Sequence, residues 1–146
     1  MRVRGFTLFE MLAVIILIGL AAVAVSIPVT QGLASARVNA ASGELAAALR
    51  YTRTQAIVKG ENQALEVDVA HATYRPAGKQ AVRLPRDMSV AITSAREDQA
   101  NATTGRIRFF PDGSSTGGRI TLKRGQREWH VNVGWLTGAV SVVQTP

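Results

Sequence analysis

The N-terminal part of the chain begins with a long apolar stretch. Residues 6–27 are apolar apart from three clearly polar members, which are Thr7, Glu10 and Ser26. A helix of this length extends about 33 Å, which is enough to cross the hydrocarbon core of a bilayer. Arg2 and Arg4 precede the stretch, and basic residues of this kind tend to stay on the cytoplasmic side. The pattern predicts a transmembrane helix over 6–27, with the bulk of the chain outside the cytoplasm.

A helical period continues beyond this stretch. Pro28 should kink or break the helix locally. After it, small and apolar residues recur at spacings of three and four, namely at Val38, Ala41, Leu45, Ala48, Leu49, Thr52 and Ala56. Gly60 directly follows Lys59 and is a favourable C-terminal stop. We predict one long helix over about residues 6–59. The C-terminal part of the stripe faces a core, and the alanine-rich first part packs against neighbouring helices or the membrane surface.

Beyond Gly60 the hydrophobic period changes to two, which is typical of β-strands. Leu65, Val67 and Val69, for example, fall on one side of their segment. Turn residues separate the strand candidates, which are 64–69, a short one at Tyr74, 81–84, 88–93, 105–110, 118–124, 128–134 and 138–143. Segment 94–105 is polar and is predicted to be a loop. We expect an α+β fold, with an antiparallel sheet or a small two-sheet sandwich over 60–146 packed on the helix.

Charge and composition narrow the classes of function. The chain has 17 Lys and Arg against 10 Asp and Glu, a formal net charge of +7. Loss of the first five residues would lower this charge to about +5. The cations are scattered, so no basic tail is predicted, and charge alone makes nucleic acid an unlikely partner. There is no cysteine, which excludes disulfides, thiolate zinc sites and cysteine nucleophiles.

The carboxylate inside the apolar stretch calls for a reason. A charged side chain at membrane depth costs at least ~2.5 kcal/mol and is usually kept for a purpose. The sequence RGFTLFEMLAVIILIG around Glu10 resembles the class III leader of type IV pilins and type II secretion pseudopilins. In this resemblance Gly5 is the small residue before the cut, Phe6 becomes the new N-terminus, and Glu10 is the fifth mature residue. Thr7 and Leu8 also fit the pattern.

The resemblance implies how the N-terminus is processed. A membrane prepilin peptidase would cut between Gly5 and Phe6 and release residues 1–5 as the leader, and Phe6 would be N-methylated. The cut leaves a cationic amine at the membrane end of the helix. Glu10 can then pair with the amine of a neighbouring subunit, which offsets the cost of burying both charges. Phe6 and Glu10 are therefore the expected assembly residues.

Two simpler interpretations of the N-terminus remain open. One is a conventional secretory signal, because Ala34-Ser35-Ala36 has the form of its cleavage site. Against it, the apolar run exceeds the usual 7–15 residues and Glu10 interrupts its start. The other is a plain membrane anchor in which Glu10 lies near the interface. A conventional signal would favour a periplasmic enzyme.

Segment 109–120, FFPDGSSTGGRI, is the other candidate for chemistry. It lacks the GxxxxGK[ST] spacing of a phosphate-binding loop and opens no helix. A serine nucleophile would require G-x-S-x-G at a strand-to-helix elbow with a nearby histidine, whereas Ser114 and Ser115 precede a strand candidate. We interpret the segment as a glycine-rich turn between two strands.

This segment and the strands after it resemble the GspH/FimT family. The residues that carry the resemblance are Phe110, Pro111, Gly113, Ser114, Ser115, Gly117, Gly118, Ile120, Leu122, Trp129, Val131, Val133 and the stretch Thr137 to Val140, which includes Gly138. The resemblance implies a pilin-like fold in which 28–59 is the periplasmic half of the helix and 60–146 a globular β domain. It implies a single-pass protein of the bacterial inner membrane.

The function implied is that of an H-type minor pseudopilin. Such a subunit joins the tip region of the periplasmic pseudopilus in a type II secretion system, which moves folded proteins across the outer membrane. Its partners would be other minor pseudopilins, the major pseudopilin, the prepilin peptidase, the inner-membrane assembly platform and membrane lipid. The alternative is a FimT-like minor type IV pilin for pilus assembly or DNA uptake. The last turn reads Gly138-Ala139-Val140-Ser141 and lacks the arginines of the DNA-binding branch, which weakens that alternative.

The remaining polar and aromatic candidates fit structural roles. His71 and His130 are the only histidines, and without clustered carboxylates neither predicts a metal site. His130 should face solvent, because it alternates with Trp129 and Val131. Trp129 and Trp135 are expected in the core or at a sheet edge, and Asp112 in a turn. We find no catalytic set and expect neither a cofactor nor enzyme activity.

Overall fold

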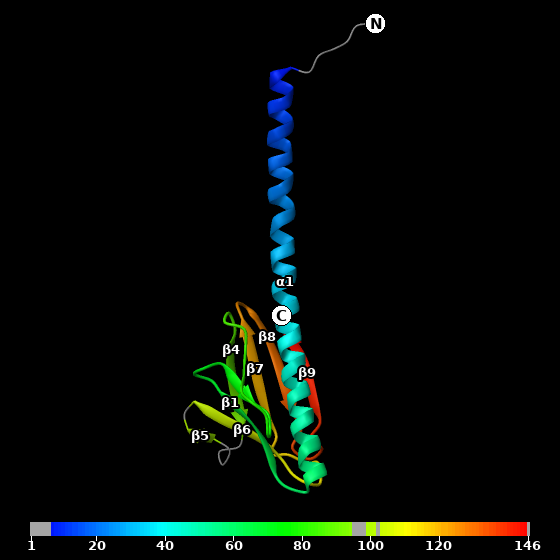
Figure 1. Cartoon of the computed structure of the whole chain (residues 1–146), viewed down its shortest axis with the longest axis vertical. Helices are drawn as coiled ribbons and strands as arrows, with labels where there is room; N and C mark the ends of the chain where they lie inside the picture. The colour runs from blue at the N-terminus through cyan, green and yellow to red at the C-terminus, as the bar shows by residue number, and fades with distance from the viewer. Residues whose placement is uncertain (1–6, 95–98, 102, 146) are drawn as a thin grey trace. The chain divides into compact units, whose positions relative to one another are not determined.

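The structure, a computed structural model, describes residues 7–94, 99–101 and 103–145, without the side chains of 24–35 and 99–101. Gly5 and Phe6 therefore lie outside the described residues. Contacts within the chain divide it into two units, residues 1–37 and residues 38–146. One helix, α1 (Leu8–Lys59), belongs to both units, and nine strands belong to the second (Figure 1).

Helix α1 ends where the sequence predicts but begins at Leu8, after the expected start at Phe6, which lies outside the described residues. It ends at Lys59, and Gly60 follows with a φ of 65°, the left-handed conformation that glycine adopts without strain. The helix continues through Pro28, so the expectation of a break there is wrong. Proline's fixed φ suits a helix, and the helix lacks only the hydrogen bond of the missing N–H at the cost of local crowding. Within the described residues, no helical stretch is both long and apolar enough to pass through a membrane.

The strands form two antiparallel sheets, which is the two-sheet alternative of the sequence analysis. The first has the order β3-β2-β1-β6-β5 and the second the order β4-β7-β8-β9. Their bounds are β1 (Gln63–Asp68), β2 (Thr73–Arg75), β3 (Val82–Arg83), β4 (Ser89–Ser94), β5 (Gln99–Asn101), β6 (Thr104–Phe109), β7 (Gly118–Arg124), β8 (Arg127–Val133) and β9 (Val140–Thr145).

The core lies between the two sheets and the C-terminal part of α1. Six of the seven residues of the predicted helix stripe are buried, and the seventh, Ala48, is partly buried. The buried inner residues of the strands alternate with residues that are partly buried or exposed, as the period of two predicts. The central ones are Leu65 and Val67 of β1, Ile107 and Phe109 of β6, Ile120 and Leu122 of β7, and Trp129 and Val131 of β8.

Strand β5 lies in a segment that the sequence analysis assigned to a loop. Gln99 and Asn101 pair with Gly105 and Thr104 of β6, with a register shift between them. An edge strand of this kind needs only backbone hydrogen bonds on one side, so it can form without apolar alternation. The loop expectation for 94–105 is therefore wrong at Ser94, the last residue of β4, at β5 and at the start of β6.

Candidate functional site

The glycine-rich segment connects β6 to β7, as predicted, and begins with a tight turn. The N–H of Gly113 donates to the carbonyl of Phe110 at 2.9 Å, with Pro111 at the position that favours its fixed φ. Asp112 then accepts hydrogen bonds from the Ser114 hydroxyl at 2.6 Å and from the Ser114 N–H at 2.9 Å. Both bonds lower the pKa of Asp112 below its ordinary 3.8, and the bond from the Ser114 hydroxyl has the larger effect. Asp112 is thus a turn residue, as expected.

The next two residues attach the segment to other strands. Ser115 is buried; its hydroxyl donates to the carbonyl of Gly134 at 3.0 Å and accepts the N–H of Gly117 at 3.0 Å. The Ser115 N–H donates to the carbonyl of Trp135 at 2.8 Å. The Thr116 N–H donates to the carbonyl of Arg108 at 2.9 Å, and the Arg108 N–H donates to the hydroxyl of Thr116 at 3.2 Å. The hydroxyl of Ser115 therefore donates its proton to a backbone carbonyl, which is typical of a serine with a structural role.

Helix α1 contacts the same segment through an arginine that the sequence analysis did not single out. The Arg53 Nε donates to the carbonyl of Gly113 at 2.8 Å. Gly138, in the turn between β8 and β9, lies against both groups with a φ of 61°. A Cβ at Gly138 would collide with the Gly113 carbonyl oxygen and lie 2.7 Å from the Arg53 Nε. Only glycine fits this close approach.

Two more glycines of the segment are required by neighbouring strands. Gly117 has a φ of 70°, and a Cβ there would lie 3.0 Å from the Cβ of Trp135. Gly118 has a φ of 148°, and a Cβ there would lie 2.7 Å from the carbonyl oxygen of Thr93 in β4. The motif residues thus join β4, β6, β7, the β8–β9 turn and α1. We call residues 110–118, together with Arg53 and Gly138, the motif joint.

The tryptophans differ from each other. Trp129 is in the core, as expected, and its indole N–H donates to Asn39 Oδ1 at 2.8 Å. Trp135 is in the turn after β8 with 70% of its surface exposed, so its expected place in the core or at a sheet edge is wrong. Its backbone carbonyl accepts the N–H of Ser115.

The histidines lie apart from the motif joint. His71 Nδ1 lies 2.7 Å from Asp68 Oδ2, and this hydrogen bond is the largest cause that lowers the pKa of Asp68. His130 points away from the core, as predicted, but is half-buried, with Nδ1 3.1 Å from the hydroxyl of Thr121. In the described parts of the chain, no three histidine or acidic side chains gather into a group that could hold a metal ion.

At the N-terminus the structure describes Thr7 and Glu10. The Thr7 hydroxyl accepts the Glu10 N–H at 3.3 Å, and the Thr7 carbonyl accepts the N–H groups of Glu10 and Met11 at 3.1 and 3.2 Å. Thr7 is therefore the N-cap of α1, with Glu10 three residues later, the spacing of a capping box. The sequence analysis missed this cap, although its T-x-x-E signal is visible in the chain. Glu10 is exposed in the single chain.

The chain is similar to known protein families, to a known protein and to a solved structure. The model of the family described as type II transport protein GspH matches residues 41–137, and the model of the prokaryotic N-terminal methylation motif matches residues 1–26. Type II secretion system protein H of Xanthomonas campestris pv. campestris is 43% identical over 139 residues, which cover 95% of this chain and 82% of that protein.

A solved structure is similar in fold. The minor pseudopilin EpsH from the type 2 secretion system of Vibrio cholerae superposes with a TM-score of 0.56 at 10% sequence identity. The match covers 72% of this chain and 94% of that one. The pilin-like α+β architecture is therefore shared, although almost all of the side chains differ. The GspH match contains the motif joint except for Gly138, which directly follows its last residue, and the methylation motif contains Gly5, Phe6 and Glu10.

Proposed function

Since this chain belongs to the GspH family of type II transport proteins, it is a minor pseudopilin, and we propose that it is built into the tip region of a periplasmic pseudopilus. The observation that carries this proposal is the presence of two matches on one chain. The methylation motif covers residues 1–26, and the GspH model covers most of the β domain. In this role the protein is a structural subunit that helps to drive the export of folded proteins.

The N-terminus is the part that directs assembly. A prepilin peptidase cleaves between Gly5 and Phe6, and Phe6 is then methylated. Residues 6–27 anchor the subunit in the inner membrane by a single pass, with the C-terminal domain in the periplasm. The methylation motif and the two arginines before the apolar stretch support this orientation.

Glu10 makes the contact that admits the subunit to the filament. It is exposed on the first turn of α1 in the single chain. In the assembly its carboxylate pairs with the N-terminal amine of a neighbouring subunit, where each charge offsets the burial of the other. The neighbours are other minor pseudopilins and the major pseudopilin, added at the inner-membrane assembly platform within membrane lipid.

The test is the intact mass of the mature full-length chain from cells with and without the prepilin peptidase. We expect a peptidase-dependent species that begins at methylated Phe6. A species that begins at Arg37, or an uncut chain in both cells, would overturn the proposal and restore the conventional signal or plain anchor. Co-purification with the other pseudopilins of the same system then tests the assembly role.

A further inference from the structure

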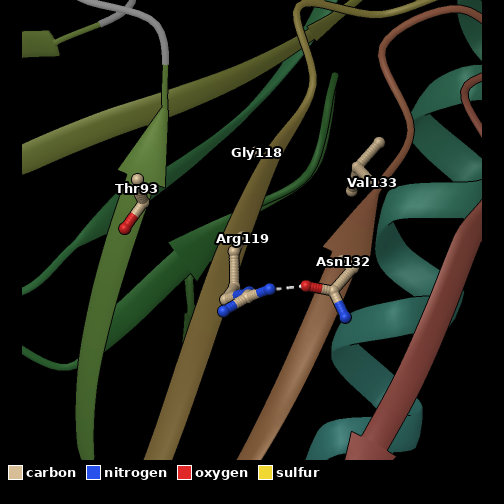
Figure 2. Close-up of a pocket in the computed structure, with 5 residues that line it drawn as sticks. All are labelled: Thr93, Gly118, Arg119, Asn132 and Val133. Carbon is tan, nitrogen blue, oxygen red and sulfur yellow. Dashed lines mark hydrogen bonds between the residues drawn. The ribbon is translucent and has the colours of Figure 1, made fainter.

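The outer face of the second sheet carries a row of polar side chains that run across its strands. Thr93 of β4 is the register partner of Arg119 in β7, and Arg119 is the partner of Asn132 in β8. Directly paired residues of an antiparallel sheet lie on the same face. Figure 2 shows these side chains on three neighbouring strands. Together with Gly118 and Val133 they line a shallow pocket of about 470 Å³.

The guanidinium of Arg119 is oriented by its neighbour. Its Nε donates to Asn132 Oδ1 at 2.6 Å, drawn as the dashed line in Figure 2. This bond uses the Nε–H donor of the planar fork and leaves the N–H donors of the two terminal nitrogens for other partners. A fixed, planar pair of N–H donors matches the two oxygens of a carboxylate. Because Asn132 holds the group in place, less side-chain entropy is lost when a carboxylate binds.

On the part of this face that the structure describes, no carboxylate balances the charge of Arg119. The other cation on the outer face is Lys123, which pairs with Glu128 at 3.0 Å. Glu128 also lies 3.8 Å from His130 Nε2. Among the described residues, no carboxylate lies within ion-pair distance of Arg119, and its polar contact is the amide of Asn132. An exposed cation with an oriented fork, and with no acid paired to it among the described residues, is suited to an acid from another molecule.

From this geometry we infer that Arg119, positioned by Asn132, binds an aspartate or glutamate side chain of another pseudopilin subunit. The inference rests on the proposed function, because that function supplies the class of partner. A single guanidinium balances the single charge of a carboxylate. The flanking hydroxyl of Thr93 and the amide of Asn132 add neutral hydrogen-bonding groups at the pocket.

The experiment uses the full-length chain, purified from membranes in which the other pseudopilins of its own secretion system are co-expressed. We expect Arg119→Gln to lower the recovery of one partner subunit roughly tenfold, most clearly at low ionic strength. Lys123→Gln is the matched control, because it removes the same charge from the same face, where Glu128 already balances it. Recovery of the partner subunit with Lys123→Gln should stay within about twofold of its recovery with the unsubstituted chain.

Charge reversal identifies the contact. Arg119→Glu should abolish recovery of that partner, and an acid-to-lysine substitution in the partner should restore it. The inference would be overturned if Arg119→Gln recovered as much of the partner subunit as the unsubstituted chain. It would also be overturned if Arg119→Gln and Lys123→Gln lowered that recovery equally. A clear loss of thermal stability in the isolated Arg119→Gln chain would overturn it too, since that result would place the partner acid within the chain itself.

Failure of the proposed function looks different in the same experiment. In that case the unsubstituted chain recovers none of the co-expressed pseudopilins. If the unsubstituted chain recovers them and Arg119→Gln does so equally well, the function stands and the inference about Arg119 fails.

Discussion

Gly138 shows how a single missing side chain can determine a contact between distant segments. The turn after β8 approaches the Gly113 carbonyl and the Arg53 guanidinium so closely that no Cβ fits. This requirement could not be predicted from the sequence, because Arg53 and Gly113 are 60 positions apart. A family pattern can mark Gly138 as characteristic, but the reason for it appears only when the three groups are in place.

We expect Gly138→Ala to lower the free energy of unfolding by at least about 2 kcal/mol, because the new Cβ adds a backbone collision to a left-handed φ. Denaturant unfolding of the full-length chain in detergent measures the change. Gly43→Ala is the matched control, since Gly43 is inside α1 with nothing within 4 Å of an added Cβ. It should stabilise the protein by about 0.5–1 kcal/mol. Equal stability of the two variants would contradict the close approach at Gly138.

Asp112 gives the motif joint a pH dependence. Its folded-state pKa is lowered, chiefly by the hydrogen bond from the Ser114 hydroxyl. A lowered pKa means that the ionised form is favoured by folding, so its contribution is complete above the ordinary value of 3.8 and is lost as the pH falls through the folded-state pKa.

Asp112→Asn should therefore make stability less dependent on pH in the acid range, as followed by the unfolding temperature from neutral to acid pH. Ser114→Ala should have a similar effect because it removes the principal cause of the shift, whereas Ser141→Ala, on the exposed strand β9, should have none. An unchanged acid dependence in Asp112→Asn would show that other carboxylates account for it.

At the scale of elements, the sequence predicted what depends on burial and missed what depends on backbone pairing. The stripe from Val38 to Ala56 indicated the buried face of α1, because a helix repeats its facing residues every three or four positions. Most strands followed from their apolar alternation. Strand β5 has no such signal, because its residues Gln99, Ala100 and Asn101 do not alternate between polar and large apolar side chains. The prediction for Trp135 was wrong because a large aromatic side chain suggests burial. In the structure, the backbone carbonyl of Trp135 accepts a hydrogen bond from Ser115 of the motif joint.

The helix stripe contributes buried side chains to the core, and the sequence could foresee this contribution. Leu49 is fully buried in the core, so Leu49→Ala should cost about 2–5 kcal/mol of unfolding free energy through lost burial and a cavity. Val58→Ala, one more truncation on α1, removes a side chain that is 74% exposed and should change stability by less than about 0.5 kcal/mol. Chemical denaturation of the two full-length variants gives the comparison. Similar losses would mean that this face of α1 does not pack as described.

For the whole molecule, Glu10 must serve two purposes. It is the third residue after the cap of α1, and in the proposed filament it is also the partner of a neighbouring amine. Glu10→Gln separates these purposes, because glutamine can still complete a capping box but carries no charge. We expect this variant to be cleaved by the peptidase normally and to be strongly depleted from the pseudopilus, as measured by its recovery with sheared filaments.

Thr7→Ala is the converse control. It removes the cap, at a cost of about 1 kcal/mol to the helix end, and leaves the charge in place. Filament entry should survive this change. If Thr7→Ala were depleted as strongly as Glu10→Gln, filament entry would depend on the capped end of α1 as well as on the charge of Glu10.

The hydrogen bonds of the motif joint have a consequence for amide exchange and proteolysis. A glycine-rich loop on a protein surface normally exchanges its amide protons quickly and is an early site of cleavage. Here most backbone N–H groups of the loop donate to acceptors within the protein. The donors are the N–H groups of Phe110, Gly113, Ser114, Ser115, Thr116 and Gly117. Deuterium uptake in this loop should therefore be nearly as slow as in strands β6 and β7, and proteases should cut the chain elsewhere first. In this protein the segment richest in glycine is among the most rigid.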